Sequence, residues 1–489
     1  MDVLDTKGYW LTRLLLERGI GVICLVAFLV ALNQFRPLLG ERGLQPVPLF
    51  VKRVPFRESP SLFYLFPRDA AFTTAAWLGI ALSVLVITGI ATRYTWSNVL
   101  VWSAIYVLYL SFVNVGQTFY AFGWESILLE ACFFAIFLGG SRALPQAIPI
   151  WLFRWLTFRI MFGAGLIKMR GDECWRNLTC LNYFYETQPM PNPASWFFHW
   201  APQWLNTGGV LFNHFSELIV PFFYFLPQPF AGIAGLLTIV FQGSIIVSGN
   251  LSWLNWLTLI LAFSTLDAHF LSRIFKHVPA FPPLSPPEQW VNYVLAAAVV
   301  LMSIPVVVNM LSARQIMNTN FNSLHLVGTY GAFGSITRPR YEVIVEGTDD
   351  SVITPATQWR EYEFKAKPGD VRRLPPQIAP YHLRLDWLMW FAAMSSYQDY
   401  PWFVNLVAKL LAGDRAVLGL MRSNPFPGKP PHYIRALLYE YHFTTPDGRR
   451  KTGSWWTRSF TGFYFPAVSL DSPGFQNVLR EQGWLAVHN

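Results

Sequence analysis

Long apolar stretches alternate with shorter polar segments over the first two thirds of the chain. Windows of roughly 17–25 apolar residues suit the core of a bilayer, and several stretches approach that length, while the shorter ones would need flanking residues to cross. The pattern therefore predicts about nine membrane-spanning helices. They cover residues 20–32, 70–91, 98–115, 126–138, 148–167, 212–226, 230–247, 254–266 and 289–311.

The pattern changes after the last of these stretches, where charged residues return. Alternating, β-branched and aromatic positions then predict strands, and two longer apolar patterns predict helices. This part is long enough to bury a core of its own. The predicted strands are 341–347, 361–367 and 435–444, and the predicted helices are 384–394 and 402–413.

We therefore predict a polytopic α-helical membrane domain of about nine spans, residues 1–312, followed by an extramembrane α+β domain, residues 313–489. Two long loops, 33–69 and 168–211, interrupt the membrane domain. Residues 279–287, PAFPPLSPP, predict a stiff linker before the last span, because proline cannot continue a helix.

Composition supports the membrane assignment. Apolar residues make up 53% of the 489 and charged residues only 13%, whereas a soluble protein is about a quarter charged. The 21 Trp and 20 Tyr suit the two interfaces of a bilayer. The net charge of +9 comes without a basic tract or a nucleic-acid motif, so we expect the lipid bilayer as a partner and no nucleic acid.

The loop that follows the 148–167 span is unusually rich in charged and aromatic residues. Loops between membrane helices are ordinarily short or bland, so this density predicts a packed structure at the membrane surface, and we expect function to centre on it. We call this predicted feature the central-loop surface. Its residues are Arg170, Asp172, Trp175, Arg176, Tyr185, Glu186 and Gln188.

Two cysteines, Cys174 and Cys180, stand in this loop as CWRNLTC. Their spacing could close a small loop by a disulfide in an oxidising compartment; the alternative is a pair of free thiols. The CxxC of a redox centre and the second pair of a zinc site are absent. A disulfide would put loop 168–211 outside the cytoplasm, together with the C-terminal domain if there are nine spans. Cys24 and Cys132 fall in apolar spans and are interpreted as packing residues.

Ionisable residues also occur inside the apolar stretches, where they are costly and usually face protein or a water-filled cavity. Glu125 could cap a helix at the interface or act within the membrane. Glu130 lies one turn deeper, and Arg154 and Arg159 in the next span are possible partners.

A further polar group occurs in FNHFSELIVPFF, where Asn213, His214 and Glu217 lie within about one helical turn. His214 and Glu217 are three residues apart and would share a helix face. A metal site would need more ligands, and no HExxH pattern is present. The alternative is a hydrogen-bonded cluster that holds helices together. With Glu130 and Arg159, these residues form the predicted polar membrane cluster, for which we expect no metal and no cofactor.

Long segments of the chain, in order, resemble the lipase maturation factor family. They are FGAGLIKMRGDECWRNLTCLNYFYETQPMPNP, FNHFSELIVPFF, YGAFGSITRPRYEVIVEG, WREYEFKAKPGD, RLDWLMWFAAM and NPFPGKPPHYIRALLYEY. The resemblance implies a multispanning protein whose animal members reside in the endoplasmic reticulum, where they help secreted lipases of the lipoprotein lipase type fold and assemble. It implies a secreted lipase or another exported protein as client. The membrane would be that of the endoplasmic reticulum in a eukaryote or the cytoplasmic (inner) membrane in a bacterium, with the C-terminal domain on the lumenal or periplasmic side.

A shorter segment is similar to the active-site region of the vitamin K-dependent gamma-carboxylase and its bacterial relatives. The spacing after Lys168 is about two residues longer than in that family, and Ile167 replaces one of its paired lysines. Lys168 could be a desolvated base, or it could extend its charge toward Asp172 or Glu173. The matching residues are Ala164, Gly165, Lys168, Asp172 and Trp175.

Two functions from different classes follow. The first is a membrane-integrated folding factor that holds clients on exposed aromatic side chains and performs no covalent chemistry. The second is a membrane enzyme in which Lys168 is the base and Glu130, Arg159, His214 and Glu217 line a cavity for a lipid-like cofactor or substrate. A cavity lined by Lys168, His214 and Glu217 and open to lipid would favour the enzyme, and a solid helical bundle with an exposed aromatic groove outside would favour the folding factor. A transport role is disfavoured, because no inverted repeat is visible.

Overall fold

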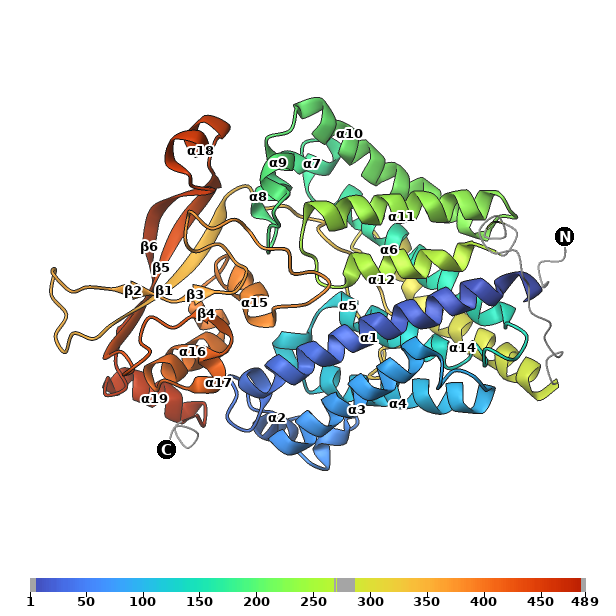
Figure 1. Ribbon diagram of the computed structural model, residues 1–489, viewed down its shortest axis with the longest axis horizontal. Helices are drawn as coiled ribbons and strands as arrows, with labels where there is room; N and C mark the ends of the chain where they lie inside the picture. Colours follow the sequence, from blue (N-terminus) through green and yellow to red (C-terminus); the bar gives the residue numbers. More distant parts are fainter. Residues whose placement is uncertain (1–5, 268–269, 271–285, 485–489) are drawn as a thin grey trace.

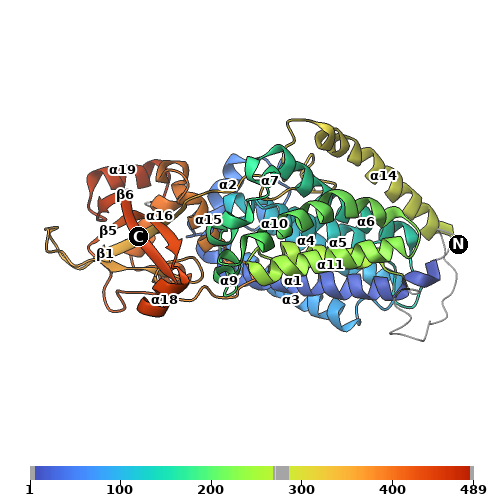
Figure 2. The same cartoon turned by 90° about the horizontal axis from the view of Figure 1, so that it is seen from above.

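The computed structural model describes residues 6–267, 270 and 286–484. It has a helical half and a half built around a β-sheet, which lie end to end (Figure 1). The first long helix begins at the end of the helical half that is far from the sheet (Figures 1 and 2). The predicted linker at 279–287 lies outside the described residues except for Pro286 and Pro287, which begin the last long helix.

Six described helices are long and apolar enough to cross a membrane, which confirms a polytopic helical membrane domain. The last of them, α14, lies at the edge of the helical half and exposes most of its apolar surface (Figure 2). The six are α1 (Trp10–Leu39), α3 (Asp69–Thr88), α4 (Thr95–Asn114), α6 (Ala147–Arg170), α11 (Phe230–Ser248) and α14 (Pro286–Leu311).

The other three predicted spans are also helical, but they are short or composite. Helix α5 (Gly123–Ala135) has 13 residues and is thus about 20 Å long, shorter than a bilayer core of about 30 Å. Because it is almost wholly buried, protein surrounds it instead of lipid. Helix α12 (Leu254–Ala262) ends in the short turn η6 (Phe263–Thr265). The remaining segment joins α10 (Gln203–His214), the π-helical turn η4 (Phe215–Ile219) and the 3-10 turn η5 (Val220–Phe225).

Short helices occupy the N-terminal segment and the connections at the sheet end of the helical half. They divide the two long predicted loops into packed pieces. They are η1 (Thr6–Tyr9), α2 (Val47–Arg53), η2 (Leu62–Tyr64), η3 (Gln117–Tyr120), α7 (Glu173–Arg176), α8 (Leu181–Thr187) and α9 (Ser195–His199).

The long loop after α6 and the C-terminal half lie at the same end of the helical half (Figure 1). The connection after α11 meets them there, because Asn250 Nδ2 donates a hydrogen bond to Pro376 O at 2.8 Å. At the opposite end Arg13 Nη1 donates to Ala143 O at 2.9 Å. The connections between helices thus separate into two groups, as they do in a membrane domain.

The C-terminal half contains a four-stranded antiparallel sheet in the order β2-β1-β5-β6 and a two-stranded ribbon of β3 and β4. Strand β1 pairs with β5 along its whole length, with Val343 opposite Leu438. The predicted strands at 341–347 and 435–444 correspond to β1 and β5, whereas 361–367 forms only two short strands. The strands are β1 (Arg340–Thr348), β2 (Arg360–Glu361), β3 (Glu363–Phe364), β4 (Met421–Ser423), β5 (Tyr433–Phe443) and β6 (Trp456–Val468).

Helices pack around this sheet, and α15 stands between it and the helical half (Figure 1). Both helices predicted for this half are present as α15 and α16. The α+β class of the C-terminal half is therefore confirmed. Its helices are α15 (Arg384–Ala392), η7 (Tyr397–Asp399), α16 (Pro401–Leu411), α17 (Arg415–Leu418), α18 (Pro446–Thr452) and α19 (Pro473–Glu481).

Residues 313–339 form an irregular segment that crosses back over the helical half, and we call it the crossing segment. Tyr106 Oη of α4 donates to Leu324 O at 2.6 Å, and Trp175 Nε1 donates to Phe333 O at 2.9 Å. Gly163 of α6 is required at this contact, because a Cβ there would lie 2.4 Å from Tyr330 O. The main buried apolar core extends through both halves, and two smaller apolar clusters lie beside it in the described part of the chain. The boundary between 312 and 313 stays a prediction.

Candidate functional site

Lys168 forms a buried polar cluster with Asn213 at the end of α10 and Glu217 in the turn η4 that follows. Its Nζ donates to Glu217 Oε1 at 2.6 Å and to Asn213 Oδ1 at 2.9 Å. Asn213 Nδ2 donates to Glu217 Oε2 at 3.0 Å, so each member contacts both others. The Lys168 ammonium also lies 4.9 Å from the centre of the Trp175 ring. Lys168 therefore pairs with Glu217, and the predicted pairing with Asp172 or Glu173 is corrected.

The π-helical turn that carries Glu217 follows from the sequence. Pro221 has no N–H group, so the carbonyl of Glu217 four residues earlier loses its α-helical donor. The helix widens to a π turn at Phe215–Ile219 and then tightens. Single π turns occur frequently at functional sites.

His214 lies outside this cluster, in contrast to the prediction that it shares a face with Glu217. Its Nε2 is 2.9 Å from Trp175 O. Asn213 and Glu217, four residues apart, share the face instead. Among the described residues, no three His, Cys, Asp or Glu side chains come together as potential metal ligands.

Glu130 and Arg159 form a second, separate group. They make a buried ion pair, as predicted, and Tyr330 Oη donates to Glu130 Oε2 at 2.7 Å. Arg159 Nη1 also donates to Gly328 O at 2.9 Å. The predicted polar membrane cluster is therefore corrected to two separate clusters. Asn213 and Glu217 bind Lys168, whereas Glu130 and Arg159 bind each other and the crossing segment. The other candidate partner, Arg154, donates to Ser264 O at 2.8 Å instead.

A third buried ion pair joins the two halves. Arg384 Nη1 of α15 donates to Glu125 Oε1 of α5 at 2.8 Å, and both side chains are 0% exposed. Tyr109 Oη donates to the other carboxylate oxygen of Glu125. Sequence reasoning considered Glu125 but not its partner, since RLDWLMWFAAM gives no sign that its arginine is buried.

Asp172 anchors the start of the long loop. Its carboxylate pairs with Arg338 of the crossing segment at 2.8 Å and accepts hydrogen bonds from the amides of Cys174 and Ile336. The hydrogen bonds from Arg338, with these amides, hold the pKa of Asp172 well below its ordinary value. Arg176, which is exposed, donates to Met169 O at 2.9 Å near the end of α6.

Four residues of the predicted central-loop surface are buried, so the prediction of a surface is corrected for them. Their polar atoms bind the rest of the protein: Trp175 as described above, Glu186 through the amide of Phe443 at 2.6 Å, and Gln188 through Ser248 O at 3.0 Å. Tyr185 stacks on Phe198. Arg170 and Arg176 remain exposed. The four buried residues are Trp175, Tyr185, Glu186 and Gln188.

The residue that fixes this loop against the sheet was not predicted. Arg340, at the start of β1, is buried and donates to Glu186 O at 2.9 Å and to Pro189 O at 3.1 Å. Its charge is balanced by Glu342 at 2.6 Å, which also lies 2.9 Å from the ammonium of Lys367. The signal available in the sequence was the pair Arg340 and Glu342, which stand two positions apart at the start of a largely apolar strand and so share one face of it.

The four cysteines form two close pairs. Cys174 of α7 and Cys180, which directly precedes α8, have Cα atoms 4.8 Å apart and sulfurs within bonding distance. Cys24 and Cys132 are buried in α1 and α5 with sulfurs 3.3 Å apart. The prediction that the second pair has a packing role is consistent with this burial.

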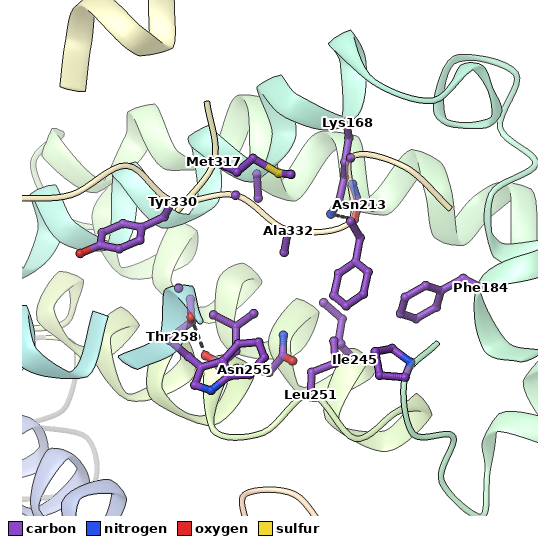
Figure 3. A pocket seen from close by; sticks show the side chains of 18 of the residues that line it. Lys168, Phe184, Asn213, Ile245, Leu251, Asn255, Thr258, Met317, Tyr330 and Ala332 are labelled. Atoms are coloured by element: carbon purple, nitrogen blue, oxygen red, sulfur yellow. Dashed lines mark hydrogen bonds between the residues drawn. The ribbon is translucent and has the colours of Figure 1, made fainter. Parts of the chain in front are cut away.

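A cavity of about 740 Å³ lies where the helical half meets α15 and the crossing segment. Lys168, Asn213 and Glu217 line one side of it. Aromatic side chains from both halves form much of the rest, with Trp124 and Phe184 from the helical half and Trp387 from α15. Figure 3 shows Lys168 and Asn213 on one side and Asn255 and Thr258 on the opposite side. Glu130, Arg159 and His214 do not line the cavity within the described part of the chain, so the predicted lining is corrected to Lys168 and Glu217.

Comparison with known proteins identifies the family. Residues 11–273 match the lipase maturation factor transmembrane domain, and residues 326–466 match the lipase maturation factor C-terminal domain. The chain belongs to the lipase maturation factor family. It is 44% identical to human lipase maturation factor 1, covering 98% of this chain and 91% of the relative. It is 29% identical to Xenopus laevis lipase maturation factor 2, with 95% and 83% covered.

The resemblance to the lipase maturation factors is thereby confirmed over nearly the whole chain. The first matched domain covers the helical half up to residue 273 and so omits α14, and the second covers the end of the crossing segment and the sheet half through most of β6. No solved structure matches the protein.

Proposed function

We propose that this protein is an integral membrane maturation factor that helps secreted lipases, or related exported proteins, fold and assemble. The observation that carries the proposal is the 44% identity to human lipase maturation factor 1 over 98% of the chain. The several membrane-spanning helices make the protein an integral membrane protein. The class of client is inferred from the name of the relatives. The structure has exposed surfaces on which such a client could bind.

In this proposal the C-terminal half and the loop after α6 act together outside the membrane, on the lumenal side of the endoplasmic reticulum or the periplasmic side of a bacterial inner membrane. The Asp172–Arg338 ion pair and the contacts of Arg340 join these regions. A disulfide between Cys174 and Cys180 requires the oxidising side. Both features support placing the C-terminal half where exported clients fold.

We place client contact on β6, one of the two edge strands of the four-stranded sheet and much longer than the other, β2. An edge strand presents unpaired N–H and C=O groups that can bind an extended chain. Phe460 and Phe463 on β6 are 54% and 71% exposed. Exposed aromatic side chains beside free backbone groups suit an incompletely folded client that exposes apolar residues.

The experiment is deletion of the gene in the native host, followed by complementation and measurement of secreted lipase activity per mass of lipase. Wild-type protein should restore specific activity without changing lipase synthesis. A Phe460→Ser, Phe463→Ser variant should restore little, whereas Val352→Ser, which removes another apolar side chain of 68% exposure from the same half, should restore activity fully. Normal lipase specific activity in the deletion strain would refute the maturation role. Full complementation by the double variant would refute only the role of β6.

The membrane enzyme remains a second candidate, because the cavity places Lys168 and Glu217 beside an apolar space. The ammonium of Lys168 donates hydrogen bonds to both Glu217 and Asn213, which argues against a role of Lys168 as a free base. A Lys168→Arg variant separates the two functions, as described in the Discussion.

A further inference from the structure

The cavity at the junction of the two halves has balanced charge. Within the described residues, Lys168 and Glu217 are its only charged lining side chains, and they pair at 2.6 Å. Asn213 hydrogen-bonds to both of them. A ligand with a net charge would lose its hydration without gaining an unpaired counter-charge, which is costly in an apolar site. An uncharged ligand avoids that cost.

The opposite side of the cavity offers hydrogen-bonding groups without charge. Asn255 Nδ2 donates to Gln242 Oε1 at 2.7 Å, and Gln242 Nε2 approaches Met161 Sδ at 3.1 Å. A thioether is a weak acceptor, so this amide can turn to a better partner. Asn255 Oδ1 accepts no hydrogen bond from the described residues and is available to a hydroxyl group.

The cavity also has the size and access that a lipid requires. Its volume of about 740 Å³ lies within the range of roughly 300–1,000 Å³ for small-molecule sites. Its lining reaches the outside of the helical half between α10 and α11, where Leu205 and Ser244 are exposed. The same helices expose Leu211 and Val240, which are 52% and 60% accessible. Because α11 is one of the candidate spans, this opening faces the bilayer.

We propose that the cavity binds an uncharged lipid that enters from the bilayer between α10 and α11. Its head carries hydroxyl or carbonyl oxygens, which bind near Asn213 and Asn255. Its apolar part lies against the aromatic side chains, among them Phe184 and Trp387. This site goes beyond the proposed maturation function and does not depend on it.

The test uses full-length protein in phosphatidylcholine nanodiscs and a monoacylglycerol probe with a photoactivatable diazirine in its acyl chain. Mass spectrometry of the labelled peptides should find the label on cavity-lining residues, including those of the 330–335 stretch. Excess unlabelled monoacylglycerol should lower labelling by about tenfold, and a fatty acid of the same chain, ionised at neutral pH, should compete poorly. Label confined to the outward faces of α11 and α14 would overturn the site.

Three substitutions sharpen the test. Ser244→Trp places a large side chain at the opening and should lower labelling by about tenfold, whereas Val300→Trp, at a 65% exposed position of α14 away from the cavity lining, should leave labelling unchanged. Equal labelling of both variants would overturn the entry route.

Glu217→Gln leaves the charge of Lys168 unbalanced, so the fatty acid should become the better competitor. If folded Glu217→Gln protein still preferred monoacylglycerol over the fatty acid, the assignment of an uncharged head would be overturned. The same would follow if the fatty acid competed as well as monoacylglycerol for the wild-type protein.

Discussion

The Glu125–Arg384 ion pair permits a quantitative test of how the two halves are held together. Both side chains are 0% exposed, and Arg384 also donates to Phe119 O at 2.7 Å and lies 3.4 Å from the centre of the Tyr120 ring. Glu125→Gln leaves the arginine charge buried without its carboxylate, and Arg384→Met leaves the carboxylate without its cation. Breaking a buried pair in this way costs about 3–5 kcal/mol of unfolding free energy.

The double variant Glu125→Gln, Arg384→Met removes both charges, so it should cost much less than the sum of the single changes. We expect a coupling free energy of about 3 kcal/mol, at the upper end for residues in contact. The assay is a double-mutant cycle on purified protein in mild detergent, with tryptophan fluorescence followed through a reversible denaturant titration. Limited proteolysis provides a second measurement, because the single variants should release the C-terminal half from the helical half more readily.

The matched control is the exposed pair Asp447–Arg450, whose side chains are 75% and 78% exposed. Removing either partner there should change stability by only about 0–1 kcal/mol. If the two changes at Glu125 and Arg384 were additive within about 0.5 kcal/mol, the inference that this pair joins the halves energetically would be refuted.

Three further predictions concern the loop after α6, its anchor Asp172, and Lys168 in the last turn of α6. Peptide mapping without reductant should recover Cys174 and Cys180 in one disulfide-linked pair; free thiols in protein from native membranes would contradict the predicted sidedness. Because Arg338 lowers the pKa of Asp172 in the fold, the ionised carboxylate stabilises the protein above the ordinary pKa of 3.8, and this stability is lost as the pH falls below that value. The difference in melting temperature between wild type and Asp172→Asn should therefore be constant near neutral pH and shrink in acid; a constant difference throughout would count against the pairing. Lys168→Arg should keep most maturation activity, because it preserves a cation beside Glu217; a stable, inserted but inactive variant would favour the membrane enzyme.

Apolar runs and strand patterns predicted most of the fold, because helix and strand periodicity are local properties. Strand β6 was missed for a physical reason: its buried and exposed positions do not alternate regularly, and its pairing with β5 shifts register at several places. Bulged edge strands lose the period of two on which sequence recognition depends.

The pairings within the candidate site were harder to predict than the residues themselves. Glu125 and Arg384 are 259 positions apart, and Lys168 and Glu217 are 49 apart. Sequence reasoning paired Lys168 with nearby acidic residues, whereas the fold brings a more distant one to it. His214 was assigned to the cluster from ideal α-helical spacing, which the π turn before Pro221 changes.

The crossing segment has a consequence for the order in which the chain is made. Glu130 and Arg159 lie within the helical half, yet Tyr330 and the carbonyl of Gly328 complete their hydrogen bonds. Both partners are synthesised after α14, which ends at Leu311. At roughly 5–20 residues per second, the ribosome adds them about a second or more after the last span. The membrane-embedded helices thus await residues from beyond the last span before their packing is complete, and a nascent chain that stops short of Tyr330 carries an unfinished interior that quality-control proteases can recognise.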